Sequence, residues 1–468
     1  MDLKAAVQPP PRPACLNDAA LILPNPVPDL PDPEAALRAA LRRPISGKPL
    51  AERVPPTGDV VVILPDRARP TTPTAMMLRA VLDELAGPLG GRWERVLLLI
   101  GTGTHRPHAM EASALPEGMP AGIRSACHVA VAHDELIRIG RIPARLHWFV
   151  WFAGILLWDA LRHLPSTAVD LARALVRADG TELRRLLGYG LPLRLVLAAM
   201  AAWGPYPRMN RRVVEAGLVI AIGRVKPHPF TGYAGGVKGI WPAAAGRVDA
   251  GLNHLLQLHP HTRPGRVRGN PLLADLETIV SHLGNAMVVN LVSGPNGAPA
   301  GFFAGDPIPA HRAASALARD VALVPAHPAD LVVIGNREQG RLDLFQYIKS
   351  LVQAGRMARP GGAVVCCGEL AYGASGTGDP HTRPNFAIKE VVYHLGIRPA
   401  IARDVAFWLA SPNAFEIARG SFFRPAASLE DALAAARRRV GPSARVAWVP
   451  DIDSVIPVLD GDRPGEWL

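Results

Sequence analysis

Short runs of branched apolar residues, each closed by a turn, constrain the fold of this chain more than any other feature. They are DVVVIL at 59–64, RVLLLI at 95–100, LVIAI at 218–222, DLVVI at 330–334, AVVCC at 363–367 and a last run at 445–449. Runs of this length and composition are typical of buried strands. Residues 74–85 have the pattern of a helix between the first two runs, so the sequence predicts a βαβ unit of a parallel sheet.

The strand-and-helix pattern occurs twice along the 468 residues, with a loop-rich stretch around 295–309 between its two parts. Further helices are predicted at 34–41, 344–354 and 428–439, the last of them beginning with the capping pattern Ser428-x-x-Asp431. We therefore predict an α/β fold of two α/β domains, 1-318 and 319-468, with the active site in the cleft between them. Ligands of such sheets bind beyond the carboxyl ends of the strands.

One segment of the first domain is unusually apolar. Residues 146–164 (LHWFVWFAGILLWDALRHL) and 186–203 carry most of its apolar side chains, and charged residues such as Asp159 interrupt them. Each uninterrupted apolar run is well under the roughly 18–20 residues that span a bilayer. We therefore predict an apolar helical insertion, about 142–205, that packs on protein. Contact of 146–203 with a membrane surface is the less favoured alternative.

The basic residues of the chain do not gather into a nucleic-acid surface. The formal net charge is +11, which suits nucleic acid, an anionic membrane or an anionic substrate. Most of the arginines are scattered, however, and the compact run Arg437-Arg438-Arg439 ends a predicted helix, where cations suit the helix dipole. We therefore expect a small-molecule partner and no nucleic acid.

The cysteines and the first residues indicate a cellular location. Cys15, Cys127, Cys366 and Cys367 show no C-x-x-C spacing, so the sequence predicts neither a zinc knuckle nor a disulfide framework. The opening stretch MDLKAAVQPPPRPACLND lacks the apolar core of a signal peptide. Together these features favour a cytoplasmic protein.

Three histidines follow strands or short helices in places suited to chemistry. His105 follows a strand in GTGTHRP, His228 follows another and is held between two prolines, and His254 lies in GLNHLL. A single histidine is usually structural. Two at the carboxyl ends of two strands in one sheet point into the same crevice, as a pair of acid/base groups must. Inversion of a stereocentre needs such a pair on opposite faces of one carbon.

Polar and cationic side chains accompany these histidines. Arg69 follows the first strand in DRARP and is placed to hold a carboxylate in a bidentate fork, although pairing with Asp66 is the plainer interpretation. Gln346 and Lys349 lie three residues apart on one helix face and so reach one ligand together. An ordinary solvated helix surface is the alternative for this pair.

A glycine-rich turn ends in a lysine but is not a nucleotide-binding loop of the usual kind. Gly232, Gly235 and Gly236 in GYAGGVKG free backbone N–H groups for a phosphate. Lys238 is followed by glycine, whereas a Walker loop has a serine or threonine there for magnesium. A phosphate-handling enzyme is therefore the weaker interpretation of this turn.

Six motifs together resemble the nickel-dependent lactate racemase family, the LarA-like 2-hydroxyacid racemases and epimerases. They are DRARPTTP, GTGTHR, KPHPFTGYAGGVKGIWP, GLNH, GNPLLADLE and LDLFQYIK. The spacings of ten residues from His228 to Lys238 and of sixteen from Lys238 to His254 agree with the family pattern. The resemblance runs from about residue 33 to residue 378 and excludes the tryptophan-rich segment.

The resemblance implies a cofactor and the residues that hold it. The family binds a nickel-pincer nucleotide (pyridinium-3,5-bisthiocarboxylic acid mononucleotide), whose soft planar donor set suits Ni(II). By resemblance Lys238 forms the covalent thioamide link to this cofactor, and His254 is the nickel ligand supplied by the protein. Asp66, Gly235 and Gly236 are expected to border the cofactor.

The resemblance also implies an isomerase that acts on a lactate-like 2-hydroxy acid. His105 or His228 removes the hydroxyl proton while the Cα hydride moves to the cofactor, and the other histidine handles the proton on the opposite face. The cofactor carries the hydride because Cα–H is too weak an acid for imidazole. Arg69, Gln346 and Lys349 are expected to orient the substrate carboxylate and oxygen from both domains.

Three departures from the family pattern bear on the substrate. Phe345 stands where the family has tyrosine, Arg341 stands where it usually has aspartate, and the segment at about 142–205 is extra. They make a bulkier or more apolar 2-hydroxy acid an alternative to lactate. A non-enzymatic cofactor-holding or peripheral membrane protein of the same fold is the other alternative, which the intact His105 and His228 pair disfavours. The sequence leaves open whether the chain forms a homo-oligomer.

Overall fold

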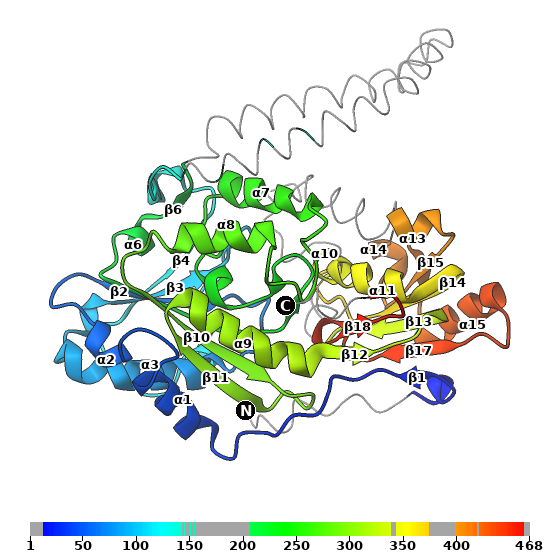
Figure 1. The fold of residues 1–468 in the computed structure, drawn as a ribbon, viewed down its shortest axis with the longest axis horizontal. Helices are drawn as coiled ribbons and strands as arrows, with labels where there is room; N and C mark the ends of the chain where they lie inside the picture. Colours follow the sequence, from blue (N-terminus) through cyan, green and yellow to red (C-terminus); the bar gives the residue numbers. More distant parts are fainter. Residues whose placement is uncertain are drawn as a thin grey trace, which may run out of the picture.

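The computed structural model describes residues 13–142, 145, 150, 154, 206–337, 343–373, 398–418 and 421–462. Apart from residues 150 and 154, the helices predicted at 146–164 and 186–203 lie outside these ranges, as does Arg341. Two six-stranded sheets, each accompanied by helices, make up the described chain (Figure 1). The predicted α/β class is therefore confirmed. Within these ranges no helix combines the length and apolarity needed to cross a bilayer.

The first sheet has the strand order β11-β10-β7-β2-β3-β4, and all its pairs are parallel except β10 with β11. The strands are β2 Val60–Pro65, β3 Val96–Gly101, β4 Arg124–Cys127, β7 Leu218–Arg224, β10 Ala286–Ser293 and β11 Pro299–Gly305. The surrounding helices are α1 Pro33–Arg42, α2 Leu50–Arg53, α3 Thr74–Leu89, α6 Arg211–Val214, α7 Arg247–Leu255, α8 Pro271–Val280 and α9 Pro307–Ala322. The helices predicted at 34–41 and 74–85 are confirmed as α1 and α3.

Both faces of this sheet are buried, because alternate side chains of each strand face different helices. Val61 and Ile63 of β2 belong to the core that includes α8, whereas Val60, Val62 and Leu64 pack with α1 and α3. Figure 1 shows α7 and α8 on one side of the sheet and α1, α2 and α3 on the other. Burial on both faces explains why the strands are continuous apolar runs with no alternation.

The loop-rich stretch predicted around 295–309 is wrong in part, because it contains β11. The strand has the sequence PAGFFAG, whose glycine and proline content is typical of a loop. It is the edge strand of the sheet and pairs with β10 only. An edge strand tolerates proline at its first position, since that residue needs no N–H for the ladder.

The second sheet is parallel throughout, with the order β1-β17-β13-β14-β15-β16. Its strands are β1 Ala20–Leu21, β13 Ala329–Gly335, β14 Ala358–Cys367, β15 Ala406–Ala410, β16 Arg424–Ala426 and β17 Val446–Val449. Its helices are α10 Leu344–Tyr347, α11 Leu351–Met357, α13 Arg398–Ala402, α14 Ala414–Ile417 and α15 Leu429–Val440. The predicted cap of α15 is confirmed, since the Ser428 hydroxyl accepts the Asp431 N–H at 3.1 Å.

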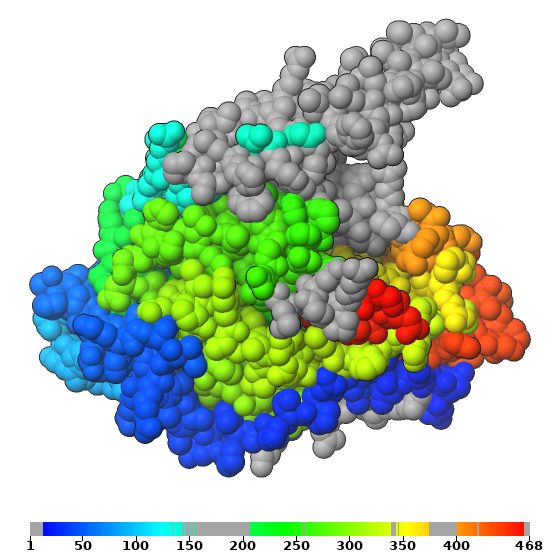
Figure 2. Space-filling model, in the orientation of Figure 1, coloured from blue at the N-terminus to red at the C-terminus, as the bar shows by residue number. Residues whose placement is uncertain are grey.

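Both ends of the chain cross between the two sheets. β1 pairs with β17 of the second sheet, and the chain then runs along the molecule to α1 of the first (Figures 1 and 2). Near the other end, β18 (Ile456–Val458) pairs with β12 (Leu323–Pro325), directly after α9. The position 318/319 thus falls inside α9, and the domain limits 1-318 and 319-468 stay a prediction.

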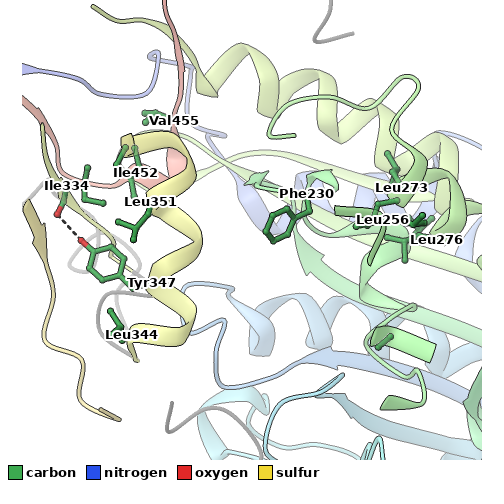
Figure 3. Packing of buried hydrophobic residues seen from close by; sticks show 14 of the residues in the cluster. Phe230, Leu256, Leu273, Leu276, Ile334, Leu344, Tyr347, Leu351, Ile452 and Val455 are labelled. Atoms are coloured by element: carbon green, nitrogen blue, oxygen red, sulfur yellow. Dashed lines mark hydrogen bonds between the residues drawn. The ribbon is translucent and has the colours of Figure 1, made fainter. Parts of the chain in front are cut away.

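The helix predicted at 344–354 is broken into α10, a 3₁₀ turn at Ile348–Ser350, and α11. Its start is fixed by Asp343, whose carboxylate accepts the Gln346 N–H at 2.8 Å. The Tyr347 hydroxyl lies 2.8 Å from the Ile334 carbonyl and 2.9 Å from the Cys367 carbonyl, at the ends of β13 and β14 (Figure 3). These contacts hold α10 over the carboxyl ends of the second sheet.

Apolar and charged contacts join the two halves. One continuous core includes Phe230 and leucines of α8 together with Leu344 and Leu351 of the second half (Figure 3). Lys226, just before β8 (Pro227–His228), forms an ion pair of 3.2 Å with Asp453. The other oxygen of Asp453 accepts the Ser350 hydroxyl at 3.0 Å.

A fully buried ion pair anchors the chain where the extra segment begins. Arg145 Nε lies 2.7 Å from Asp275 Oδ1, and a second guanidinium nitrogen lies 3.3 Å from Oδ2. Asn253 of α7 donates to the same Oδ2 at 2.8 Å. The side chains of Arg145 and Asp275 are 1% and 2% exposed, so water could not solvate either charge if its partner were removed. The pair therefore ties residue 145 to both α7 and α8.

Replacing Arg145 with methionine should cost about 3–5 kcal/mol of unfolding free energy, because it leaves the Asp275 carboxylate buried without its counter-charge. Denaturant unfolding measures the loss. The matched control is Arg38→Met, which removes a 2.7 Å ion pair with Asp83 whose side chains are about one-third exposed. We expect that control to cost about 0–1 kcal/mol. Equal losses in the two variants would contradict the weight given to the buried pair.

Candidate active site

The carboxyl ends of β2 and β3 bring an aspartate and a histidine together. Pro65 and Gly101 are paired in register, so Asp66 and the GTGTH turn leave the sheet side by side. His105 Nδ1 forms a hydrogen bond with Asp66 Oδ2. Burial alone would raise the pKa of Asp66, but the charge and hydrogen bond of His105 outweigh it and lower the pKa. The ionised Asp66 accepts the Nδ1 proton, which leaves the His105 Nε2 lone pair free to act as a base.

A side chain from the second sheet completes this arrangement. Gln346 Nε2 lies 3.0 Å from His105 Nε2, and the Gln346 carbonyl oxygen accepts the Lys349 ammonium at 2.9 Å. Gln346 is fully buried, so the solvated helix surface considered above is wrong for this residue. A chain of hydrogen bonds thus runs from Asp66 through His105 and Gln346 to Lys349, from one sheet to the other.

His228 has the opposite arrangement of ring protons. It lies in β8 and pairs with β9 (Gly232–Tyr233), and the chain between them turns back on it. Its Nδ1 accepts main-chain N–H groups from Phe230 at 3.3 Å and Thr231 at 3.2 Å. The neutral ring therefore carries its proton on Nε2. Burial, and then the charge of Lys238, keep its pKa well below the ordinary value.

Both the charged and the uncharged form of the Lys238 amine are populated near neutral pH. Lys238 lies in a 3₁₀ turn, Gly236–Gly239, that follows β9. Burial lowers its pKa from 10.5 to about 7, and the charges of Arg69 and Lys349 add to the effect. The pKa of Lys349 is lowered to about 8 by burial and then by Arg69. An amine with this pKa is a nucleophile at neutral pH.

His254 is oriented as a metal ligand would be. It lies on α7, and its Nδ1 donates to the Ala250 carbonyl at 2.5 Å, which leaves the lone pair on Nε2. Burial lowers its pKa to about 4 and keeps the ring neutral, and the Lys238 charge contributes to this shift. Nowhere in the described ranges do three His, Cys, Asp or Glu side chains gather as a metal site.

The predicted role of the glycines as free phosphate donors is wrong for Gly236. Its N–H donates to the Asn290 side-chain oxygen at 2.9 Å. A Cβ at Gly236 would lie 2.2 Å from His311 Cγ, and a Cβ at Gly235 would lie 2.7 Å from Val225 Cγ2. These glycines, at φ +53° and +73°, are thus needed for packing against neighbouring protein.

Arg69 does not form the surface pair with Asp66 that the sequence suggested as the plainer interpretation. Asp66 binds His105, while one Arg69 nitrogen donates to the Ala68 carbonyl at 2.7 Å. The Arg69 charge acts on Asp66, Lys238 and Lys349, so the guanidinium belongs to the same cluster. The structure therefore brings together the residues selected from five separate motifs.

Sequence reasoning missed the residues that support this cluster. Asn270 caps α8 and donates to the Phe230 carbonyl at 2.8 Å, which holds the segment after His228. Asn290 and His311 contact the turn that carries Lys238. Asn290 interrupts an otherwise apolar run, AMVVNLVS, and a polar residue in a buried strand was the available signal.

Comparison with known proteins agrees with these features. Residues 14–150 and 204–265 match the lactate racemase N-terminal domain. A lactate racemase of Thermoanaerobacterium thermosaccharolyticum is 23% identical over 447 residues, which cover 90% of each chain. A lactate racemase of Lactiplantibacillus plantarum is 21% identical over 354 residues, or 74% of this chain and 69% of that protein.

Solved structures share the fold. The lactate racemase apoprotein from T. thermosaccharolyticum superimposes with a TM-score of 0.71 at 21% identity and covers 95% of both chains. A Thermotoga maritima protein has a TM-score of 0.60 at 14% identity, over 93% of this chain and all of that one.

Two α/β halves enclose paired histidines and a half-buried amine, which are groups suited to acid/base chemistry, and the two curated relatives carry the name lactate racemase. The chain is similar to lactate racemases in its N-terminal domain, over most of its length and in its fold. The domain match omits residues 151–203, which lie within the predicted insertion. This agreement supports the insertion at about 142–205, which stays a prediction.

Replacing Asp66 with asparagine should reverse the proton arrangement of His105. An amide at this position donates to Nδ1, so the ring proton moves to Nε2 and the basic nitrogen is lost. Nitrogen-15 NMR of labelled histidine side chains distinguishes the two tautomers. Asp83→Asn, at a partly exposed carboxylate far along α3, is the control and should leave the His105 signals unchanged. A His105 ring that keeps its Nδ1 proton in Asp66→Asn would contradict the assignment.

Lys238 should react with a small acylating reagent at neutral pH. Its labelling rate should rise through about pH 7 and then level off, because the free-amine fraction saturates above the lowered pKa. Peptide mass spectrometry of the cofactor-free chain measures the rate, with the exposed Lys48 as internal reference for the reagent. Arg69→Met removes a cation and should move the midpoint to higher pH. A wild-type rate that still climbs above pH 9 would contradict the lowered pKa.

Proposed function

We propose that this chain racemises or epimerises a lactate-like 2-hydroxy acid and uses a nickel-pincer nucleotide held by Lys238 and His254. The observation that carries the proposal is the meeting of four groups in one site. They are a low-pKa amine, an imidazole with a free Nε2 lone pair, and two further imidazoles suited to acid/base work. The names of the curated relatives support lactate as the reference substrate.

The residues present fit this cofactor by their donor chemistry. The Lys238 amine is free near neutral pH, as formation of an amide-type link requires. His254 offers one nitrogen ligand, which suits a metal that carries its other donors with it. When bound, the cofactor supplies the hydride acceptor that the chain itself lacks. Because the Gly236 N–H already donates to Asn290, donors other than this N–H would hold the nucleotide phosphate.

In the proposed reaction His105 takes the hydroxyl proton. Its Nε2 carries the lone pair, and the Asp66 carboxylate stabilises the imidazolium that forms. The substrate hydroxyl must replace Gln346 at Nε2, and the freed amide then has a donor for the substrate oxygen. His105 is thus the residue prepared for the first proton transfer, which the sequence left open between the two histidines.

His228 serves the other face of the carbon. Its Nε2–H donates to the substrate oxygen, and full proton transfer from it requires a protonated ring. Two main-chain donors at Nδ1 oppose that protonation, so the two histidines are unequal partners in the reaction. The Asp66 carboxylate paired with His105 is the arrangement of an oriented general base, which favours the enzyme over the non-enzymatic alternative.

The cations of the site bind the carboxylate of the substrate. Arg69 and Lys349 lie within electrostatic range of each other and of Lys238, and burial lowers the pKa values of the two lysines. A bidentate guanidinium–carboxylate contact would orient the acid. The side chain of Phe345 and the position of Arg341 lie outside the described structure, so lactate and a bulkier 2-hydroxy acid both remain candidates.

The proposal is tested by purification from a host that makes the cofactor. We expect bound nickel, a mass adduct that is absent from Lys238→Ala, and loss of optical rotation for one or more chiral 2-hydroxy acids. His105→Asn and His228→Asn should keep the adduct but lose racemisation by about 10²–10⁴-fold, the usual weight of general acid–base groups. His327→Asn, at an exposed side chain, is the matched control. A native mass without nickel would overturn the proposal.

A further inference from the structure

The turn that carries Lys238 has little structure of its own. It is a four-residue 3₁₀ helix, Gly236–Gly239, and within the turn the Lys238 N–H donates to the Gly235 carbonyl at 3.0 Å. Two consecutive glycines with positive φ precede the lysine, and such residues lose the most freedom on folding. The direction in which the amine points therefore depends on partners from outside the turn.

The first such partner comes from the centre of the first sheet. Asn290 lies in β10 and is 1% exposed. Its Oδ1 accepts the Gly236 N–H at 2.9 Å. A buried amide in an apolar strand is unfavourable unless it is hydrogen-bonded, and this bond reaches a turn 54 residues away in the sequence. Asn290 therefore fixes the chain on the amino side of Val237 and Lys238.

The second partner comes from α9. His311 has no exposed surface, and its Nε2 lies 3.2 Å from the Ala234 carbonyl, to which it donates. Its ring carbons occupy the space that a side chain at Gly236 would need, since a Cβ there would lie 2.2 Å from Cγ and 2.4 Å from Cδ2. The imidazole thus contacts the chain at Ala234 through a hydrogen bond and at Gly236 through its ring carbons.

Asn290 and His311 bind the main chain on the two sides of Gly235: Asn290 accepts from the Gly236 N–H, and His311 donates to the Ala234 carbonyl. We propose that these two side chains are positioning residues, which hold the amine of Lys238 in the active site without touching the substrate. The inference rests on the proposed role of Lys238 as the cofactor anchor. The contacts of Asn290 and His311, however, form within the protein and do not require the cofactor.

The test measures where the Lys238 amine lies in the cofactor-free, full-length chain. The variants are Asn290→Leu, which removes the acceptor at similar volume, and His311→Phe, which keeps a ring but removes the N–H donor. The readout is the pH profile of Lys238 acylation by mass spectrometry, with Lys48 as internal reference. Thermal unfolding shows whether each variant is folded.

We expect both variants to fold and to move the midpoint of Lys238 acylation upward by at least one pH unit, because a released amine gains solvent. His311→Gln retains an N–H at the place of Nε2 and should restore the wild-type profile. Unchanged profiles in Asn290→Leu and His311→Phe would overturn the proposal. So would loss of folding in both, since the two residues would then maintain the core and not the amine.

The outcome is separate from that of the proposed function. The probe is a small acylating reagent, and neither nickel nor a hydroxy acid enters the measurement. If the amine moves as expected but no nickel is found after purification, the positioning role stands and the racemase proposal fails. If the amine does not move and racemisation is observed, the reverse holds.

Discussion

The site depends on one constraint, the alignment of parallel strand ends at a single edge of the first sheet. The register that pairs Pro65 with Gly101 places Asp66 beside the turn that carries His105. The neighbouring strand β7 leads into His228 at the same edge. The side chains of the second half, above all Gln346, can contact His105 because the strand ends of the first sheet hold that histidine in place. Parallel pairing thus holds several side chains of the site on rigid strands.

A cluster of half-buried cationic side chains gives the site its chemical character. Arg69, Lys238 and Lys349 share one region, and two of the three have lowered pKa values because burial and mutual repulsion disfavour their charges. The negative charge of Asp66 offsets this only in part. Such a region gains stability from an anion, whether a carboxylate or a phosphate. The basic composition of the chain therefore matters locally, at a small-molecule site, more than as a field over the whole surface.

The sequence allowed much of the fold to be predicted, because strands buried on both faces appear as unbroken apolar runs. It failed where composition was ambiguous, as in β11, and where pairing joins distant segments, as in β1 with β17. Site residues next to strand ends were recognised through their motifs. Their supports were not, because Asn290 and His311 act across 54 and 77 residues of chain and no local pattern encodes such contacts. The sequence singled out Gly235 and Gly236, but the neighbouring side chains that exclude a Cβ there are seen only in the folded chain.

The pairing of β1 with β17 has a consequence for how the chain is made. Ala20 and Leu21 are synthesised 427 residues before their partners Ala447 and Trp448. Until then β1 lacks its partner strand, and among the described residues β1 is the strand that covers the outer edge of β17. Contacts of such long sequence separation slow folding. The second sheet is therefore completed only after β17 has been synthesised, and until then β1 is a strand without its partner.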